Sequence, residues 1–245
     1  MSPPLHDRPR VDHLVVMADT LDAGVAWCEA TLGMTPGPGG EHTLFGTHNR
    51  VLAVASAAFP LAYLEIIAIN PAVACARATA AIDQKRWFDM DDEDLRKQVR
   101  LHGPQLIHWV ARVPDVHEAT ARLATLEIDR GEVLRASRKT PHGLLEWQIT
   151  VRPDGRRLFD GCLPTLIEGG GMHPATELPD SGLVLRSLTL KHPRITPLAR
   201  PAPRSTSPIS ACSRRRSRPS RRCWQRRAAR SCCRRHGMAE PRNGS

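Results

Sequence analysis

Apolar and polar positions in the first 70 residues follow a recognisable order of periods. Residues 11–18 (VDHLVVMA) form a short apolar run typical of a buried strand, and residues 21–32 place apolar side chains at helical spacing. Residues 44–55 are predicted to form one or two strands around Gly46, and residues 61–69 form another apolar run of strand length. This part of the chain therefore predicts a unit of the order β-α-β-β-β.

The same order returns in the second part of the chain. Residues 105–113 (QLIHWVARV) predict a strand, and Asp115 begins a helix that extends to about Ile128. Three more strands are predicted at residues 131–137, 143–151 and 164–170. The recurrence predicts two diverged copies of one unit, each too small to bury a sufficient core alone.

The connection between the copies, residues 71–104, fits no strand. It contains Trp87 and Phe88, followed by an acidic segment at residues 89–94. Asp91 is the predicted N-terminal cap of a short helix there. A calcium loop is not indicated, because the central glycine and the terminal glutamate of an EF-hand are absent.

The predicted fold class is α+β, with two paired βαβββ modules that form a concave mixed sheet around a cavity. Residues 181–192 alternate like one extra strand, which opens a further, incomplete unit. The predicted boundaries are an N-terminal extension at 1–10, a domain at 11–192 with module one at about 11–70 and module two at about 105–171, and a low-complexity tail at 193–245.

Charge divides the chain at the start of this tail. The whole sequence has 35 basic and 25 acidic side chains and a formal net charge of +10. Residues 1–193 carry −4, whereas residues 194–245 carry +14 from 15 arginines and one glutamate, with no lysine. Any argument from charge to nucleic acid therefore concerns the tail alone.

Three interpretations of the tail remain open. The segment has too little apolar surface for a core, which predicts disorder. Arginine without lysine, together with much Ser, Pro and Cys, is also what GC-rich DNA encodes when it is read out of frame. An arginine-rich arm that binds nucleic acid is the third and least favoured interpretation, since Trp224 is the segment's only aromatic side chain.

Composition also bears on location and partners. The chain has no run of about 18 apolar residues that would span a membrane, and residues 1–10 lack the apolar segment of a secretory signal. Seven cysteines, an odd number, indicate a reducing compartment without a disulfide framework. We therefore expect a cytoplasmic protein with a small-molecule ligand and no membrane partner, and a homodimer is an open possibility.

Four polar side chains interrupt apolar strands at matching places. His13 and Glu65 lie in the first and last strands of module one, and His108 and Glu168 occupy the same places in module two. A buried carboxylate is costly unless it is paired or bound to metal. Two histidines and two carboxylates suit Fe, Mn, Ni, Co or Zn. The alternatives are histidines hydrogen-bonded in the core and a Glu65 paired with Arg50.

The doubled pattern resembles the vicinal oxygen chelate superfamily, which includes glyoxalase I and extradiol dioxygenases, and within it the glyoxalase-like domain branch. The segments that carry the resemblance are VDHLVV (11–16), LDAGVAWCEATLGMTPGPGGEH (21–42), FGTHNRVL (45–52), YLEIIAI (63–69) and LPTLIEGGG (163–171). The resemblance implies a divalent metal between the modules, held by His13, Glu65, His108 and Glu168. One of the two glutamates, Glu65 or Glu168, would then act as general base.

The resemblance also places His42, Asn49 and Arg50 beside the cavity as substrate-binding residues; the alternative is a turn with a surface salt bridge. Separately, Trp147, Trp109 and Phe159 are candidates for an apolar pocket lining, with packing in the core as the alternative for each. Two function classes follow for the domain. The first is a metal-dependent lyase, isomerase or dioxygenase that acts on a small oxygen-rich substrate. The second is a metal-free protein that binds and sequesters a small molecule, because the same fold serves both.

Overall fold

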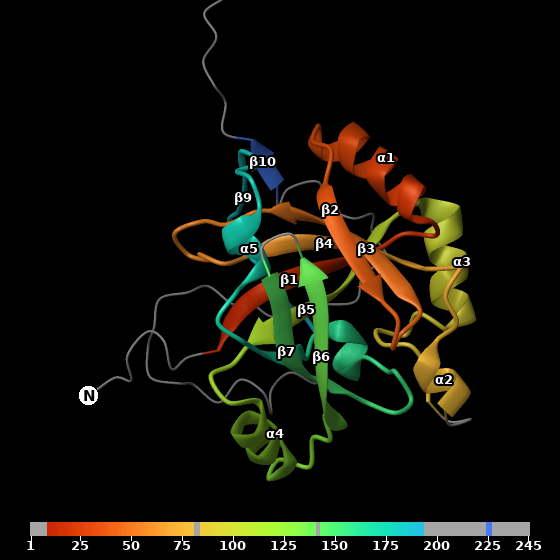
Figure 1. Ribbon diagram of the computed structural model, residues 1–245, viewed down its shortest axis with the longest axis vertical. Helices are drawn as coiled ribbons and strands as arrows, with labels where there is room; N and C mark the ends of the chain where they lie inside the picture. The colour runs from red at the N-terminus through yellow and green to blue at the C-terminus, as the bar shows by residue number, and fades with distance from the viewer. Residues whose placement is uncertain (1–8, 81–83, 141–142, 194–223, 227–245) are drawn as a thin grey trace, which may run out of the picture.

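Eight strands form one curled mixed sheet in the computed structural model, which describes residues 9–80, 84–140, 143–193 and 224–226 (Figure 1). The strand order is β2-β3-β4-β1-β5-β8-β7-β6. The strands of the first half are β1 (Arg10–Met17), β2 (Gly37–His42), β3 (Thr47–Ala53) and β4 (Tyr63–Ile69). Those of the second half are β5 (Gln105–Arg112), β6 (Glu132–Thr140), β7 (Gly143–Val151) and β8 (Thr165–Gly169). The α+β class and the concave mixed sheet are confirmed.

The two modules join at their first strands. β1 and β5 pair antiparallel, while β1 pairs parallel with β4 and β5 pairs parallel with β8. Each module therefore brings its first and last strands to the centre of the sheet. This topology explains why polar residues on those four strands are candidates for a shared site.

Each module has one long helix with a side-chain cap. Helix α1 (Leu21–Leu32) begins where the Thr20 hydroxyl accepts a hydrogen bond from the Ala23 N–H, and it ends at Gly33, whose φ is 68°. Helix α4 (Val116–Ala124) begins where Asp115 accepts from the Glu118 N–H. Both helices pack on the convex side of the sheet, where their buried side chains share clusters with strand residues.

The alternation of the strands gives the sheet two apolar faces. Leu14, Leu64 and Ile66 turn toward α1 on the convex side, while Val15 and Ile67 belong to the concave cluster. Both faces are covered, so the central strands read as nearly continuous apolar runs in the sequence.

The connection between the modules fills part of the concave side. It contains α2 (Ala76–Ala80) and α3 (Glu93–His102), and Trp87 and Phe88 enter the concave core. The Trp87 ring stacks on Phe45 at 3.8 Å and on Phe88 at 4.8 Å between ring centroids. The cap of α3 is Asp92 and not the expected Asp91, because Asp91 instead binds Arg86.

The end of the described chain covers the convex side. The extra strand expected over residues 181–192 is only three residues long, β9 (Leu183–Leu185), and its two leucines pack into the convex cluster. β9 pairs antiparallel with β10 (Trp224–Arg226). A four-residue helix, α5 (Pro174–Glu177), precedes it. The expectations for the remainder of the tail and for residues 1–8 fall outside the described residues. No helix among the described residues is long and apolar enough to cross a membrane.

Candidate functional site

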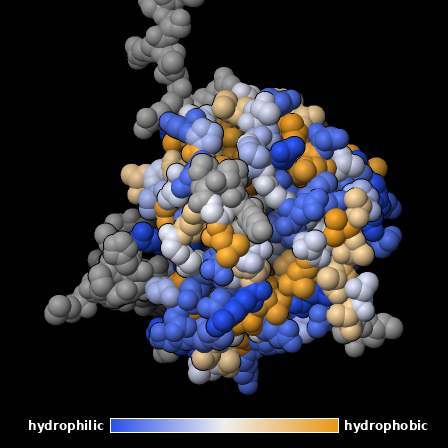
Figure 2. Space-filling view, viewed as in Figure 1, coloured by the Kyte–Doolittle hydropathy of each residue, from blue (hydrophilic) through white to orange (hydrophobic). Residues whose placement is uncertain are grey.

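A pocket opens on the concave face, between β1, β3 and β4 on one side and β5, β7 and the end of β8 on the other. Its empty space is about 580 Å³, including the part open to solvent. Hydrophobic and hydrophilic residues are intermixed over the face of the molecule that Figure 2 shows. The apolar part of the lining consists of Tyr63, Trp87, Phe88, Leu145, Trp147, Ile149, Ile167, Met172 and Pro174.

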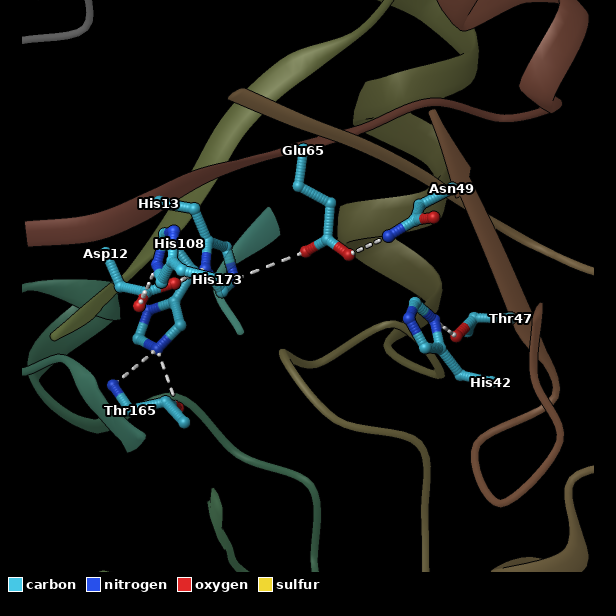
Figure 3. A network of polar contacts seen from close by, with 9 residues as sticks. All are labelled: Asp12, His13, His42, Thr47, Asn49, Glu65, His108, Thr165 and His173. Atoms are coloured by element: carbon cyan, nitrogen blue, oxygen red, sulfur yellow. Dashed lines mark hydrogen bonds and ion pairs between the residues drawn. The ribbon is translucent and has the colours of Figure 1, made fainter. Parts of the chain in front are cut away.

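The floor of this pocket holds an ion pair between neighbouring strands. His13 on β1 and Glu65 on β4 lie 3.5 Å apart, from Nε2 to Oε2, and both are buried. Nδ1 of His13 lies 2.7 Å from Oδ1 of Asp12 (Figure 3), and the imidazole stacks on Tyr63. The histidine ring is therefore held between two carboxylates.

Burial and pairing act in opposite directions on these groups. Burial alone would lower the pKa of His13, but the hydrogen bonds and charges of Asp12 and Glu65 outweigh it and raise this pKa to about 9. Burial would raise the pKa of Glu65, yet the contact with His13 outweighs it, and the pKa falls to about 2. At neutral pH the pair is an imidazolium and a carboxylate.

Asp12 is the hub of the polar network, and sequence reasoning missed it. Besides His13, it accepts a 2.9 Å hydrogen bond from Nε2 of His173, and Nη1 of Arg112 lies 3.6 Å away. Nδ1 of His173 accepts from the Ala175 N–H, so the proton of its neutral ring is on Nε2. Burial alone would raise the pKa of Asp12, but the hydrogen bonds and charges of His13 and His173 outweigh it and hold this pKa well below its usual range.

A register shift explains why Asp12 was missed. Strict alternation along β1 would turn Asp12 and His13 to opposite faces. The pairing of β1 with β5 is irregular between Val11 and His13, which turns both side chains into the same network. Only the adjacent acid–histidine dipeptide in an apolar strand was available as a signal in the sequence.

The expected substrate-binding residues divide between the pocket and the surface. Asn49 donates from Nδ2 to Oε1 of Glu65 at 2.6 Å, and its own Oδ1 accepts from the Gly40 N–H. His42, beside Thr47, and Trp147 also line the pocket. Arg50 is exposed and does not line it, because it follows Asn49 on β3 and turns to the other face. Glu65 is accordingly paired with Asn49 and His13 and not with Arg50.

The expected ligands of module two lie elsewhere. Nε2 of His108 accepts from the Thr165 N–H at 3.1 Å, and the His108 ring packs at 5.1 Å on Phe88, in a second hollow of the concave side. Glu168 shares a face of β8 with Leu166, which packs against α4, and its Oε2 accepts from the Val116 N–H at 2.9 Å. Glu168 thus stabilises the start of α4.

The structure brings together His13 and Glu65 but not the four-residue set. In the described parts of the chain, no group of three or more His, Cys, Asp or Glu side chains is placed to hold a metal ion. Both ring nitrogens of His13 face carboxylates, and Glu168 is committed to a helix start. As arranged, these side chains do not fit the expected metal centre. The other two aromatic candidates also lie outside the pocket: Trp109 packs on the convex side and Phe159 lies beside His192.

A family model and one solved structure agree with this architecture. The sequence model of a family described as "Glyoxalase-like domain" matches residues 11–204. A solved hypothetical protein from Staphylococcus aureus is 13% identical with a TM-score of 0.53, over 76% of this chain and 70% of that one. A methylmalonyl-CoA epimerase from Streptomyces coelicolor is 17% identical over 67% of this chain and 96% of its own, with a TM-score of 0.40. The epimerase from Mycobacterium tuberculosis is 16% identical over 69% and 91%, with a TM-score of 0.38. No curated protein matches the sequence.

Proposed function

We propose that the concave pocket of this chain, which belongs to the glyoxalase-like domain family, binds a small organic molecule. This molecule has an apolar body and at least one oxygen substituent. The observation that carries this proposal is the buried His13–Glu65 pair at the floor of an otherwise aromatic and aliphatic pocket. Pockets of this composition are typical of small-molecule sites, in which a few polar groups orient the ligand.

The polar groups define the ligand's chemistry. Glu65 is an ionised acceptor, so it favours a hydroxyl or an enol that donates a hydrogen bond. Arg112 supplies donors at another wall, because its guanidinium lines the pocket beside Asp12 and Gly169. A ligand with a hydroxyl or carbonyl next to a carboxylate meets both requirements. The aromatic walls then pack against its apolar body.

Removing one aromatic wall tests binding. Trp147→Ala is expected to weaken the affinity for aromatic 2-oxo and 2-hydroxy acids at least about 10-fold, because the variant leaves part of the ligand's apolar area unburied. Isothermal titration of such a panel measures this change. Trp27→Ala is the control, since Trp27 packs on the convex side. Equal affinities in the two variants would place the ligand outside this pocket.

A second candidate function is proton transfer on the bound molecule, as an isomerase or lyase performs it. The observation that favours it is a proton acceptor beside a proton donor. Glu65 is an ionised carboxylate and His13 is a protonated imidazole, and the two lie 3.5 Å apart. Glu65 would accept a proton from the carbon next to the ligand's carbonyl, and the His13 imidazolium would donate one to the product.

Exchange with heavy water separates binding from turnover. Glu65→Gln is expected to lower the rate of deuterium uptake at the carbon next to the carbonyl by at least about 100-fold, while a bound 2-oxo acid remains detectable by titration. Proton NMR of the panel in D2O measures the uptake. Glu146→Gln is the matched control, because Glu146 is an exposed carboxylate at the same pocket. A wild-type protein that binds without any exchange would leave sequestration as the function.

A further inference from the structure

A second hollow lies on the concave side of module two, beyond Trp87 and Phe88, and it contains a buried arginine. Arg130 is only 3% exposed. Its Nη2 donates to Oγ1 of Thr165 at 3.2 Å, while its Nε is buried without a hydrogen-bond partner. No carboxylate within the described ranges forms an ion pair with Arg130. The neighbouring Asp129 instead pairs with Arg152, with 3.1 Å from Oδ2 to Nη1.

The other groups of this hollow add positive charge and no negative charge. Arg152, Arg156 and Arg157 line it, and none of its lining residues is acidic. The carboxylates close by are already paired: Asp129 and Asp154 with Arg152, and Asp89 with Arg157 at 2.9 Å.

The one histidine of the hollow adds no negative charge either. His108 is neutral, because its Nε2 accepts from the Thr165 N–H. Burial, together with Arg130 and Arg157, keeps the pKa of His108 well below its ordinary value.

A buried charge without a counter-ion is among the most costly features a fold can contain. Burial and the nearby Arg152 lower the pKa of Arg130 to about 10, which still leaves the guanidinium protonated at neutral pH. The cost must therefore be offset by a group that the chain itself does not supply. The space beside the guanidinium is narrow and holds about one water-sized particle.

We propose that this hollow is a binding site for a small anion, which pairs with the guanidinium of Arg130. The size of the space favours a monatomic anion such as chloride. One oxygen atom of a carboxylate or of inorganic phosphate would pair with the Arg130 guanidinium in the same way. This site is separate from the ligand pocket described above, because the Trp87 and Phe88 rings stand between them.

Thermal unfolding of the full chain tests the site. The ionic strength is held constant with sodium gluconate, whose anion is too large for the hollow, while chloride, formate or phosphate replaces it. The wild-type melting temperature is expected to rise with chloride by about 3–5 °C for each tenfold increase above the dissociation constant. A larger response to formate or phosphate than to chloride would identify the occupant as an oxyanion.

Two arginine variants decide whether the response comes from this site. Arg130→Met is expected to abolish the anion dependence of the melting temperature, because it removes the buried charge and keeps most of the side-chain volume. Arg130→Lys is expected to retain a weaker dependence. Arg135→Met, at an exposed arginine of β6, is the control and should respond like the wild type. An Arg130→Met variant that retains the full anion response would overturn the proposal.

A measurement on the wild type alone covers the case in which the variants do not fold. Chloride bound at a buried cation broadens the chlorine-35 NMR line, and formate is expected to reverse the broadening by competition. A line width that does not change with protein concentration, together with a melting temperature that does not depend on the anion, would mean that water occupies the hollow. That result would refute the anion site.

Discussion

Asp12→Asn is expected to lower the free energy of unfolding by about 3–5 kcal/mol, the usual cost of breaking a buried ion pair from one side. The carboxylate of Asp12 is 1% exposed and faces three cationic or donor groups, namely His13, His173 and Arg112. An asparagine offers one acceptor oxygen in place of two. Its amide N–H groups would face another donor, so at least one buried group would lose its partner.

Urea unfolding at pH 7 measures this loss. Asp19→Asn is the matched control, because Asp19 forms only a 3.9 Å ion pair with Arg100 at the surface. Exposed pairs of this kind contribute little, so the control should remain within about 0.5 kcal/mol of the wild type. Equal stabilities of the two variants would show that Asp12 is not the hub of a charged network.

The periodicity of the sequence predicted most of the architecture, because the other strands of the large sheet and the two module helices have their own apolar pattern. The exception is β2 (GPGGEH), which has no apolar pattern and lies outside the predicted strand runs. Asp115, the predicted start of the second helix, caps α4 in the structure, and Thr20 and Gly33 are local signals of the same kind at the ends of α1. The connection at residues 71–104 has no such period. Its most important feature, the entry of Trp87 and Phe88 into the concave core, depends on tertiary packing and left no pattern to read.

The site was predictable only where strand neighbours determine it. His13 and Glu65 meet because β1 and β4 pair in parallel, which follows from the order of the module. Glu168 lies on the convex side because it shares a face with Leu166, and one position of register decides that face. Asp12 enters the network through a local irregularity of β1, and His173 comes from a loop far along the chain. Neither contact follows from the hydrophobic periodicity of the sequence.

The stability of the protein is expected to pass through a maximum near pH 6.5, with a different histidine on each side. The pKa of His13 is raised from 6.5 to about 9, so the stability it contributes is fully present below pH 6.5 and is lost as the pH rises through 9. At about 1.4 kcal/mol for each pH unit, the loss amounts to about 3 kcal/mol. The neutral state of His108 has the opposite effect: its lowered pKa means that stability is lost as the pH falls below 6.5, where the unfolded chain binds a proton that the folded chain does not.

Urea unfolding between pH 5 and pH 9 measures the fall in stability on each side of the maximum. Two variants assign each fall to one histidine. His13→Gln removes the group that titrates on the alkaline side, so its unfolding free energy should be nearly constant from pH 6.5 to pH 9, whatever its absolute value. His108→Gln keeps an acceptor for the Thr165 N–H. It should remove the fall in unfolding free energy below pH 6.5 and leave the fall above pH 6.5 unchanged. A wild-type protein that gains stability from pH 6.5 to pH 9 would mean that His13 is not an imidazolium between Asp12 and Glu65. The polar floor of the pocket would then have to be assigned different proton states.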